Sequence, residues 1–210
     1  NTQIITMKSG KQLLFFSFFL LLFFSCAKVY HSPDAKTLAG KQKIIAIIPP
    51  AVSIAANKKI DAESMKEQQK TESINFQSEM YSWLLRRKMQ GRIFQEIQDV
   101  VTTNAKLNAA GYPEVPLTSD EMCKVLGVDG IITSNFGLSK PISEGVAVAA
   151  VFLVGAWAPT NEVNVTLSIN DCSKSKMIWN YSHKYSGSLG SSPARLVDGL
   201  MRDASKKMPY

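Results

Sequence analysis

The sequence has few of the residues on which most enzyme active sites depend. It contains only two histidines, His31 and His183, and neither has metal-ligand spacing with cysteine or carboxylate side chains. No nucleophile elbow, phosphate-binding glycine loop or zinc-protease motif is present. These absences favour a protein that is not an enzyme and needs neither a metal nor a cofactor, and we assign no catalytic residue. A hydrolase without a recognisable motif has no support in the sequence.

Blocks of like charge are also absent. The formal charge of the 210 residues is +7, and the longest basic cluster is Arg86–Lys88. This cluster is either a nucleic-acid patch or the solvated end of a helix, where cations are favoured near the C-terminus, and the second interpretation is the better one. We therefore expect no nucleic-acid partner.

The segment before Cys26 has the composition of a secretory signal. A basic start is followed by an apolar run and a small residue: Met7, Lys8 and Lys11, then Leu13–Phe24, then Ser25. The run is shorter than the ~20 residues of a membrane-spanning helix, which favours a cleaved signal over residues 1–25 rather than an uncleaved anchor or a buried helix. We expect Asn1–Thr6 to lie upstream of the true start, and cleavage after Ser25 leaves a formal charge of +5.

The four residues Phe23–Cys26 resemble a lipobox, the motif read by lipoprotein signal peptidase. This resemblance implies cleavage between Ser25 and Cys26 and lipidation of Cys26, although Phe23 stands where leucine is usual. Several acyl chains give the stable anchoring that one chain does not. Ordinary secretion with a chance cysteine is the weaker alternative. Acidic residues directly after the cysteine send some lipoproteins to the cell surface, and none follows Cys26, which favours a position facing the periplasm. We expect the membrane to be the outer membrane.

The mature chain divides into a tether and one domain. Residues 26–41 are polar and contain Pro33 and Gly40, so we expect a flexible lipidated tether that carries a single α/β domain over residues 42–210.

Two cysteines remain after Cys26, namely Cys123 and Cys172. An oxidising compartment permits a disulfide between them, but sequence alone does not bring their Cα atoms together. Cys123 falls on the apolar face of an expected helix, where a free cysteine is commonly a small buried hydrophobe. We favour two separate thiols and keep the disulfide as the alternative.

The pattern of apolar residues predicts alternating strands and helices in the domain. Strands are predicted at Ile44–Ile48 and at residues 92–101 and 130–138. Residues 163–169 alternate between apolar and polar, which predicts a strand with one buried face, and a last strand is predicted at residues 177–185. Helices are indicated by an apolar stripe from Phe76 to Leu84 and by residues 104–110. Two further helices are indicated by a capping box at Thr118 and Glu121 and by an N-cap at Ser192 followed by Pro193. Together they predict a mixed sheet packed with helices, an α/β sandwich.

Two passages resemble the CsgG-like class of envelope lipoproteins, which includes the curli secretion channel and a lipoprotein activator of penicillin-binding proteins. They are Ile44–Pro50 and Cys123–Thr133, and the strands at 163–169 and at Ile178–Trp179 also fit. The resemblance covers roughly residues 42–208 and implies a CsgG-like fold, an association with the membrane and an envelope protein partner. It is a likeness of fold and assigns no functional residue.

Two functions follow as alternatives. The first is a non-enzymatic assembly or partner-binding lipoprotein that meets another envelope protein or forms a homo-oligomer. The second is a subunit of an outer-membrane secretion channel, in which residues 145–158 and 162–170 form a membrane-crossing β-hairpin. The first arm is apolar on both faces, which favours the first alternative. The side chains expected to contact a membrane or another subunit are Val148, Val151, Phe152, Leu153 and Trp157.

Overall fold

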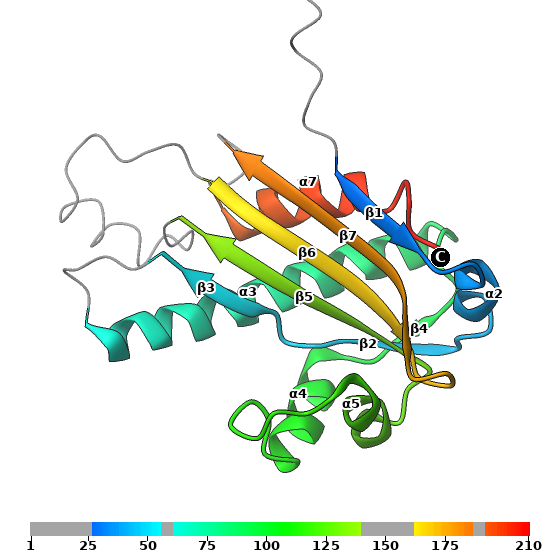
Figure 1. The fold of residues 1–210 in the computed structure, drawn as a ribbon, viewed down its shortest axis with the longest axis horizontal. Coiled ribbons are helices and arrows are strands. Elements are labelled where there is room, and N and C mark those ends of the chain that lie inside the picture. Colours follow the sequence, from blue (N-terminus) through cyan, green and yellow to red (C-terminus); the bar gives the residue numbers. More distant parts are fainter. Residues whose placement is uncertain (1–26, 56–60, 140–161, 187–191) are drawn as a thin grey trace, which may run out of the picture.

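One mixed β-sheet organises the protein. The computed structural model describes residues 27–55, 61–139, 162–186 and 192–210. Seven strands form a sheet in the order β1-β7-β6-β5-β2-β4, and β3 also pairs with β5. Helices pack against this sheet (Figure 1), so the predicted α/β fold class is confirmed.

The segment expected to be a tether is folded. Lys28–His31 forms strand β1, which pairs antiparallel with β7, and Ala35–Ala39 forms helix α2. Ala35, Leu38 and Ala39 are buried in the main core. The prediction of a flexible tether over residues 26–41 is therefore wrong from Lys28 onward. These residues gain cross-strand hydrogen bonds and apolar contacts, which their own composition does not predict.

The parallel half of the sheet is built on β5 (Gly130–Leu138). Strand β2 (Ile44–Ile47) pairs parallel with its first half and β3 (Ala51–Ile54) with its second half, and Pro49 and Pro50 lie between them. The two-residue strand β4 (Glu96–Ile97) pairs with β2 at the edge. The strand expected over residues 92–101 is thus much shorter, and a helix already begins at Val100.

An antiparallel meander forms the other half. Strand β6 (Glu162–Asp171) pairs with β5 on one side and with β7 (Lys176–Ser186) on the other. Its alternation is confirmed: Val163, Val165, Leu167 and Ile169 are buried, whereas Asn164 is exposed on the opposite face. A register shift beside Ile169 lets the neighbouring side chains of Ile178 and Trp179 both be buried.

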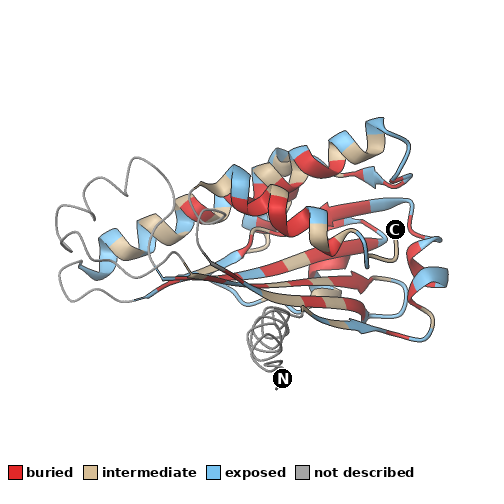
Figure 2. Ribbon diagram, turned by 90° about the horizontal axis from the view of Figure 1, so that it is seen from above, coloured by how far each residue is buried: buried red, intermediate tan, exposed pale blue. Residues whose placement is uncertain are grey.

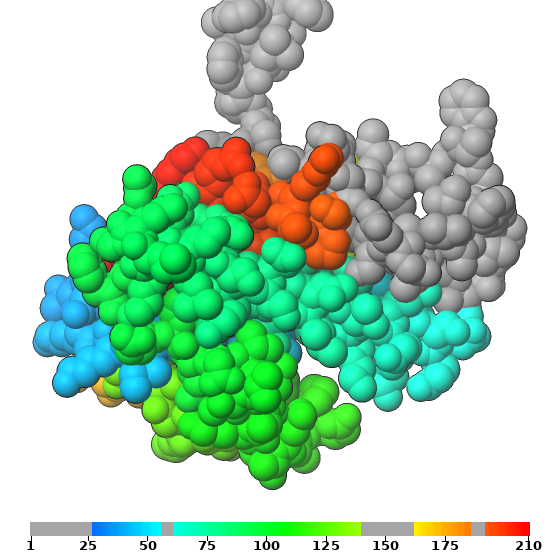
Figure 3. Space-filling view, turned by 180° about the vertical axis from the view of Figure 1, so that it is seen from behind, coloured from blue at the N-terminus to red at the C-terminus, as the bar shows by residue number. Residues whose placement is uncertain are grey.

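Two helices cover the apolar face of the sheet. Helix α3 (Ala62–Met89) and helix α7 (Pro193–Ala204) pack on each other and on the main core. The buried residues lie where these helices meet the sheet (Figure 2), and α3 crosses the back of the molecule between α7 and α4 (Figure 3). Helix α3 starts well before the predicted stripe, since Asp61 caps it by accepting from the Ser64 amide at 2.9 Å.

A second, smaller core lies beneath the other helix pair. Helix α4 (Val100–Ala109) and helix α5 (Ser119–Leu126) bury Leu107, Met122 and Leu126 against Ala46 and Ile131. Both hydrogen bonds of the predicted capping box at Thr118 and Glu121 are present, and Gly127 ends α5 with a φ of 67°.

The C-terminal side chain closes a buried polar cluster. The Tyr210 hydroxyl donates to Gln42 Oε1 at 2.7 Å, and Gln42 Nε2 donates to Asp171 Oδ2 at 3.0 Å. A Cβ atom at Gly130 would collide with the Gln42 amide. The absence of a side chain at Gly130 therefore makes room for the bond that joins the segment before β2 to the end of β6.

Candidate functional site

Several residues proposed from the sequence lie outside the described part of the chain. These are the lipidation and cleavage positions, Cys26 and Ser25, and the expected contact residues Val148, Val151, Phe152, Leu153 and Trp157. Their roles remain predictions from the sequence.

Cys123 and Cys172 form a disulfide. Their sulfur atoms are 2.04 Å apart and their Cα atoms 5.6 Å apart. The preference for two separate thiols is therefore corrected in favour of the disulfide alternative. The physical reason is the register of β5 with β6, which places Asp171 opposite Gly130 and so brings the turn after β6 next to α5. The same turn is held by the Ser175 hydroxyl, which donates to Asp120 Oδ1 at 2.6 Å.

The second arm of the hypothetical membrane hairpin is a central strand. Residues 162–170 lie within β6, which pairs along its whole length with β5 and β7 and buries one face in the main core. This arrangement contradicts a membrane-crossing role for that arm. The first arm lies outside the described residues. None of the described helices is long and apolar enough to cross a membrane.

The turn between α3 and β4 exposes two large apolar side chains. Met89 is 87% exposed and Phe94 is 83% exposed, the highest values among the large hydrophobic side chains that the structure describes. The backbone of the turn is well defined: Gly91 has a φ of 65°, its amide donates to the Lys88 carbonyl, and the Arg92 amide donates to the Arg87 carbonyl. This is a Schellman ending, so the exposed side chains project from a fixed turn.

Cations surround this turn. Arg86 and Arg92 are exposed. Arg87 lies over the Trp83 ring at 4.6 Å, and Lys88 pairs with Glu96 at 2.7 Å. The interpretation of Arg86–Lys88 as a helix end is confirmed, since these residues form the last turn of α3. We call Arg86, Met89, Arg92 and Phe94 the α3–β4 surface.

The face of β7 toward the helices carries an aromatic row. The ring of His183 lies 4.5 Å from Tyr185 and 6.2 Å from Tyr181, and the two tyrosine hydroxyls are 3.2 Å apart. His183 lies half-buried on this face, opposite its register partner, the buried Val165. Burial raises the pKa of both phenols, and the hydrogen bond between the two hydroxyls raises the pKa of Tyr185 further. The two tyrosines are therefore protonated packing residues rather than an acid–base pair.

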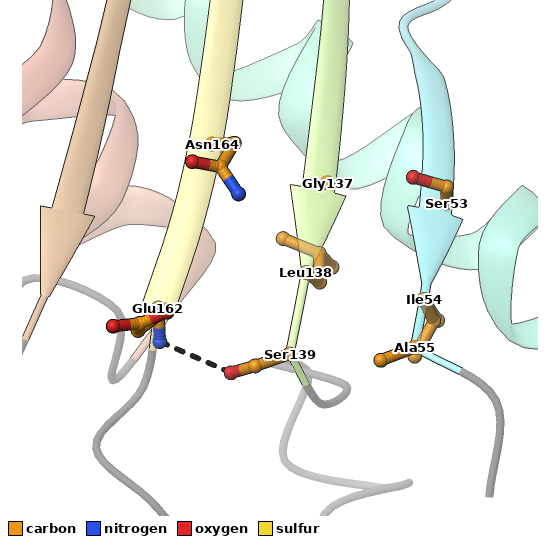
Figure 4. A pocket seen from close by; sticks show the side chains of 8 residues that line it. All are labelled: Ser53, Ile54, Ala55, Gly137, Leu138, Ser139, Glu162 and Asn164. Atoms are coloured by element: carbon orange, nitrogen blue, oxygen red, sulfur yellow. Dashed lines mark hydrogen bonds between the residues drawn. The ribbon is translucent and has the colours of Figure 1, made fainter.

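A shallow hollow of about 370 Å³ lies where three strands end (Figure 4). Ser53, Gly137 and Asn164 form one row across β3, β5 and β6, and the Glu162 amide donates to Ser139 Oγ at 3.0 Å. The Glu162 carboxylate pairs with Lys184 at 2.9 Å. The lining offers hydroxyls, one amide and one neutralised carboxylate, which can bind a polar group but do not form a nucleophile with a base.

The described residues hold no cluster of metal ligands. No group of three or more histidine, cysteine or acidic side chains comes together among them. The two histidines lie on different strands, His31 on β1 and His183 on β7.

Comparison with known proteins gives distant structural likenesses only. No protein-family model matches the sequence, and no curated protein matches it. Among solved structures, lipoprotein GNA1162 from Neisseria meningitidis is 10% identical with a TM-score of 0.45, covering 79% of this chain and 96% of that chain. The PelC dodecamer from Paraburkholderia phytofirmans is 12% identical with a TM-score of 0.39, covering 85% and 95%. The C-terminal domain of LpoB from Salmonella enterica is 10% identical with a TM-score of 0.37, covering 72% and 94%.

Proposed function

We propose that this chain is a bacterial envelope lipoprotein, anchored in the outer membrane through acylated Cys26, that binds another envelope protein and catalyses no reaction. The α3–β4 surface is the observation that carries the proposal. It combines an exposed phenylalanine, an exposed methionine and two exposed arginines. These residue types are enriched where proteins bind one another.

The proposed location has two supports. The first is the signal-like sequence that ends at Ser25 and Cys26. The second is the disulfide between Cys123 and Cys172, because structural disulfides persist in exported proteins and are rare in a reducing cytosol.

The exposed apolar side chains of the α3–β4 surface suit a docking site rather than side chains that fail to pack into the core. Phe94 and Met89 are on a turn whose backbone is fixed by hydrogen bonds, and Lys88 donates to the Gln95 carbonyl at 3.1 Å. A partner with an apolar pocket rimmed by carboxylates would complement both the apolar and the cationic side chains. A fixed surface also loses little conformational freedom on binding.

Site-specific photo-crosslinking in intact cells tests this function. A photoreactive residue at position 94 is expected to give a discrete adduct, and Met89→Ser is expected to reduce its yield. The matched control is position 108, where Asn108 is also exposed, on α4. Equal adducts from positions 94 and 108, or none from position 94, would contradict the proposal. The mass of the adduct distinguishes a second copy of this chain from another envelope protein.

A substitution on the α3–β4 surface is expected to weaken partner binding without lowering the stability of the fold. Phe94→Ala is expected to weaken the affinity for the captured partner by about 2 kcal/mol, about 30-fold in Kd, as for other aromatic hot spots. Because Phe94 is 83% exposed, the free energy of unfolding is expected to change by less than about 0.5 kcal/mol. Titration calorimetry and urea unfolding measure the two quantities.

A further inference from the structure

The first strand begins very close to the proposed anchor. Only Ala27 separates Cys26 from Lys28, where β1 starts. A chain advances at most ~3.6 Å per residue, so the Cα atom of Lys28 lies within about 7 Å of the Cα atom of Cys26. All four residues of β1 are paired with β7. The short distance from Cys26 to Lys28 therefore places the edge of the sheet, and not only a free tail, close to the proposed anchor.

The side chains of β1 have the chemistry of a membrane interface. Strand β1 is at the edge of the sheet, and Lys28, Tyr30 and His31 are exposed, Tyr30 by 49%. Tyrosine is favoured at the level of the lipid headgroups, and a lysine is attracted to anionic lipid. Among the described residues, no carboxylate forms an ion pair with Lys28. Its cation is therefore available to a phosphate headgroup.

The rest of the sheet extends away from this edge. Four strand spacings separate β1 from β2 in the order β1-β7-β6-β5-β2, which is about 19 Å at ~4.8 Å per spacing. Helix α4 contacts β2, so α4 and α5 lie on the side of the molecule opposite to β1 (Figure 1).

We propose that the β1 edge lies against the headgroups of the membrane that holds Cys26, with α4 and α5 pointing away from it. This proposal rests on the proposed lipidation of Cys26. A flexible tether would let the domain move freely above the membrane, whereas this arrangement gives the domain a fixed orientation. The α3–β4 surface belongs to the end of α3 and the turn after it, and does not include β1.

Energy transfer to the membrane tests the orientation. The lipidated full-length protein is placed in vesicles of phosphatidylethanolamine and phosphatidylglycerol that contain headgroup-labelled acceptor lipid. A donor dye is attached at Lys184→Cys or at Asn108→Cys. Lys184 lies two residues beyond Ser182, the register partner of Lys28, whereas Asn108 is exposed on α4. The other cysteines do not react, since the thiol of Cys26 carries the proposed diacylglyceryl group and Cys123 is joined to Cys172.

Transfer is expected to be several-fold more efficient from position 184 than from position 108. Insertion of a flexible linker of about fifteen residues between Ala27 and Lys28, with a span of about 21 Å, is expected to bring the two efficiencies together. Equal efficiencies without the linker, or an unchanged difference with it, overturn the proposed orientation. Mass spectrometry of the same samples separates the two claims: a lipid-free Cys26 overturns the proposed function together with this inference, whereas equal transfer from lipidated protein overturns the orientation alone.

Discussion

Reduction of the Cys123–Cys172 disulfide is expected to lower the free energy of unfolding by about 4 kcal/mol. The bond closes a loop across a sequence separation of 49 residues. In the chain-entropy description the entropy of the unfolded chain falls by about 14 cal/mol/K for such a loop, or about 4 kcal/mol at 25 °C. That is a large part of the 5–15 kcal/mol that holds a typical domain together. Urea unfolding of the mature chain carrying Cys26→Ser, with and without reductant, measures the difference.

The control is the double variant Cys123→Ala/Cys172→Ala. It is expected to have the lower stability of the reduced protein and to show no response to reductant. A change below about 1 kcal/mol on reduction, or two titratable thiols in the untreated protein, would refute the reasoning. A loss of helical signal confined to α5 at low urea would instead show that the bond restrains the smaller core alone, whose buried side chains include Met122 and Leu126.

Three further perturbations test particular parts of the fold. Thr118→Ala removes the side chain that caps α5 and bonds the Glu121 amide, and is expected to cost about 1 kcal/mol of unfolding free energy. Gly130→Ala places a methyl group against the Gln42 amide and is expected to cost about 1–3 kcal/mol. Both changes are measured by urea unfolding. An unchanged free energy of unfolding would show that the Thr118 cap, or the close contact at Gly130, does not contribute to stability. The Thr102 amide lowers the pKa of the Asp99 carboxyl, so the stability from this cap is present above a pH of about 4 and is lost as the pH falls through the lowered pKa. Asp99→Asn keeps a good cap that does not titrate, and its melting temperature is expected to fall less than that of the natural protein between pH 6 and pH 3.

The predictions that succeed depend on short stretches of sequence. The capping box at Thr118 and the N-cap at Ser192 are each complete within four residues, and both helices begin where these residues predict. The alternation along β6 is likewise local, since one face packs on the helices and the other does not. Such patterns are read correctly because the forces that produce them act within one turn or one strand.

The features that were missed depend on contacts between distant residues. Strand β1 has mostly polar residues, and only the side chain of Val29 packs on the main core from this strand. Its partners are Trp179 to Ser182, so nothing in its own composition separates an edge strand from a tether. The disulfide cannot be predicted from the sequence for the same reason, because the register of β5 with β6 brings the two cysteines together.

The α3–β4 surface was missed for a different reason. Phe94 and Ile97 have the composition of a strand, yet only Ile97 enters the sheet and Phe94 is exposed. Apolar character predicts burial in a sequence, and an exposed apolar residue is recognised only when the turn that carries it is known. The candidate partner surface therefore comes from the structure, whereas the candidate anchor comes from the sequence.

Mass spectrometry of the mature N-terminus tests the central claim most directly. We expect the first residue of the membrane-bound protein to be Cys26 carrying a diacylglyceryl group, and Cys26→Ser to release the protein from the membrane. A mature protein that retains residues 7–25, or one that begins near Cys26 without lipid, would contradict it.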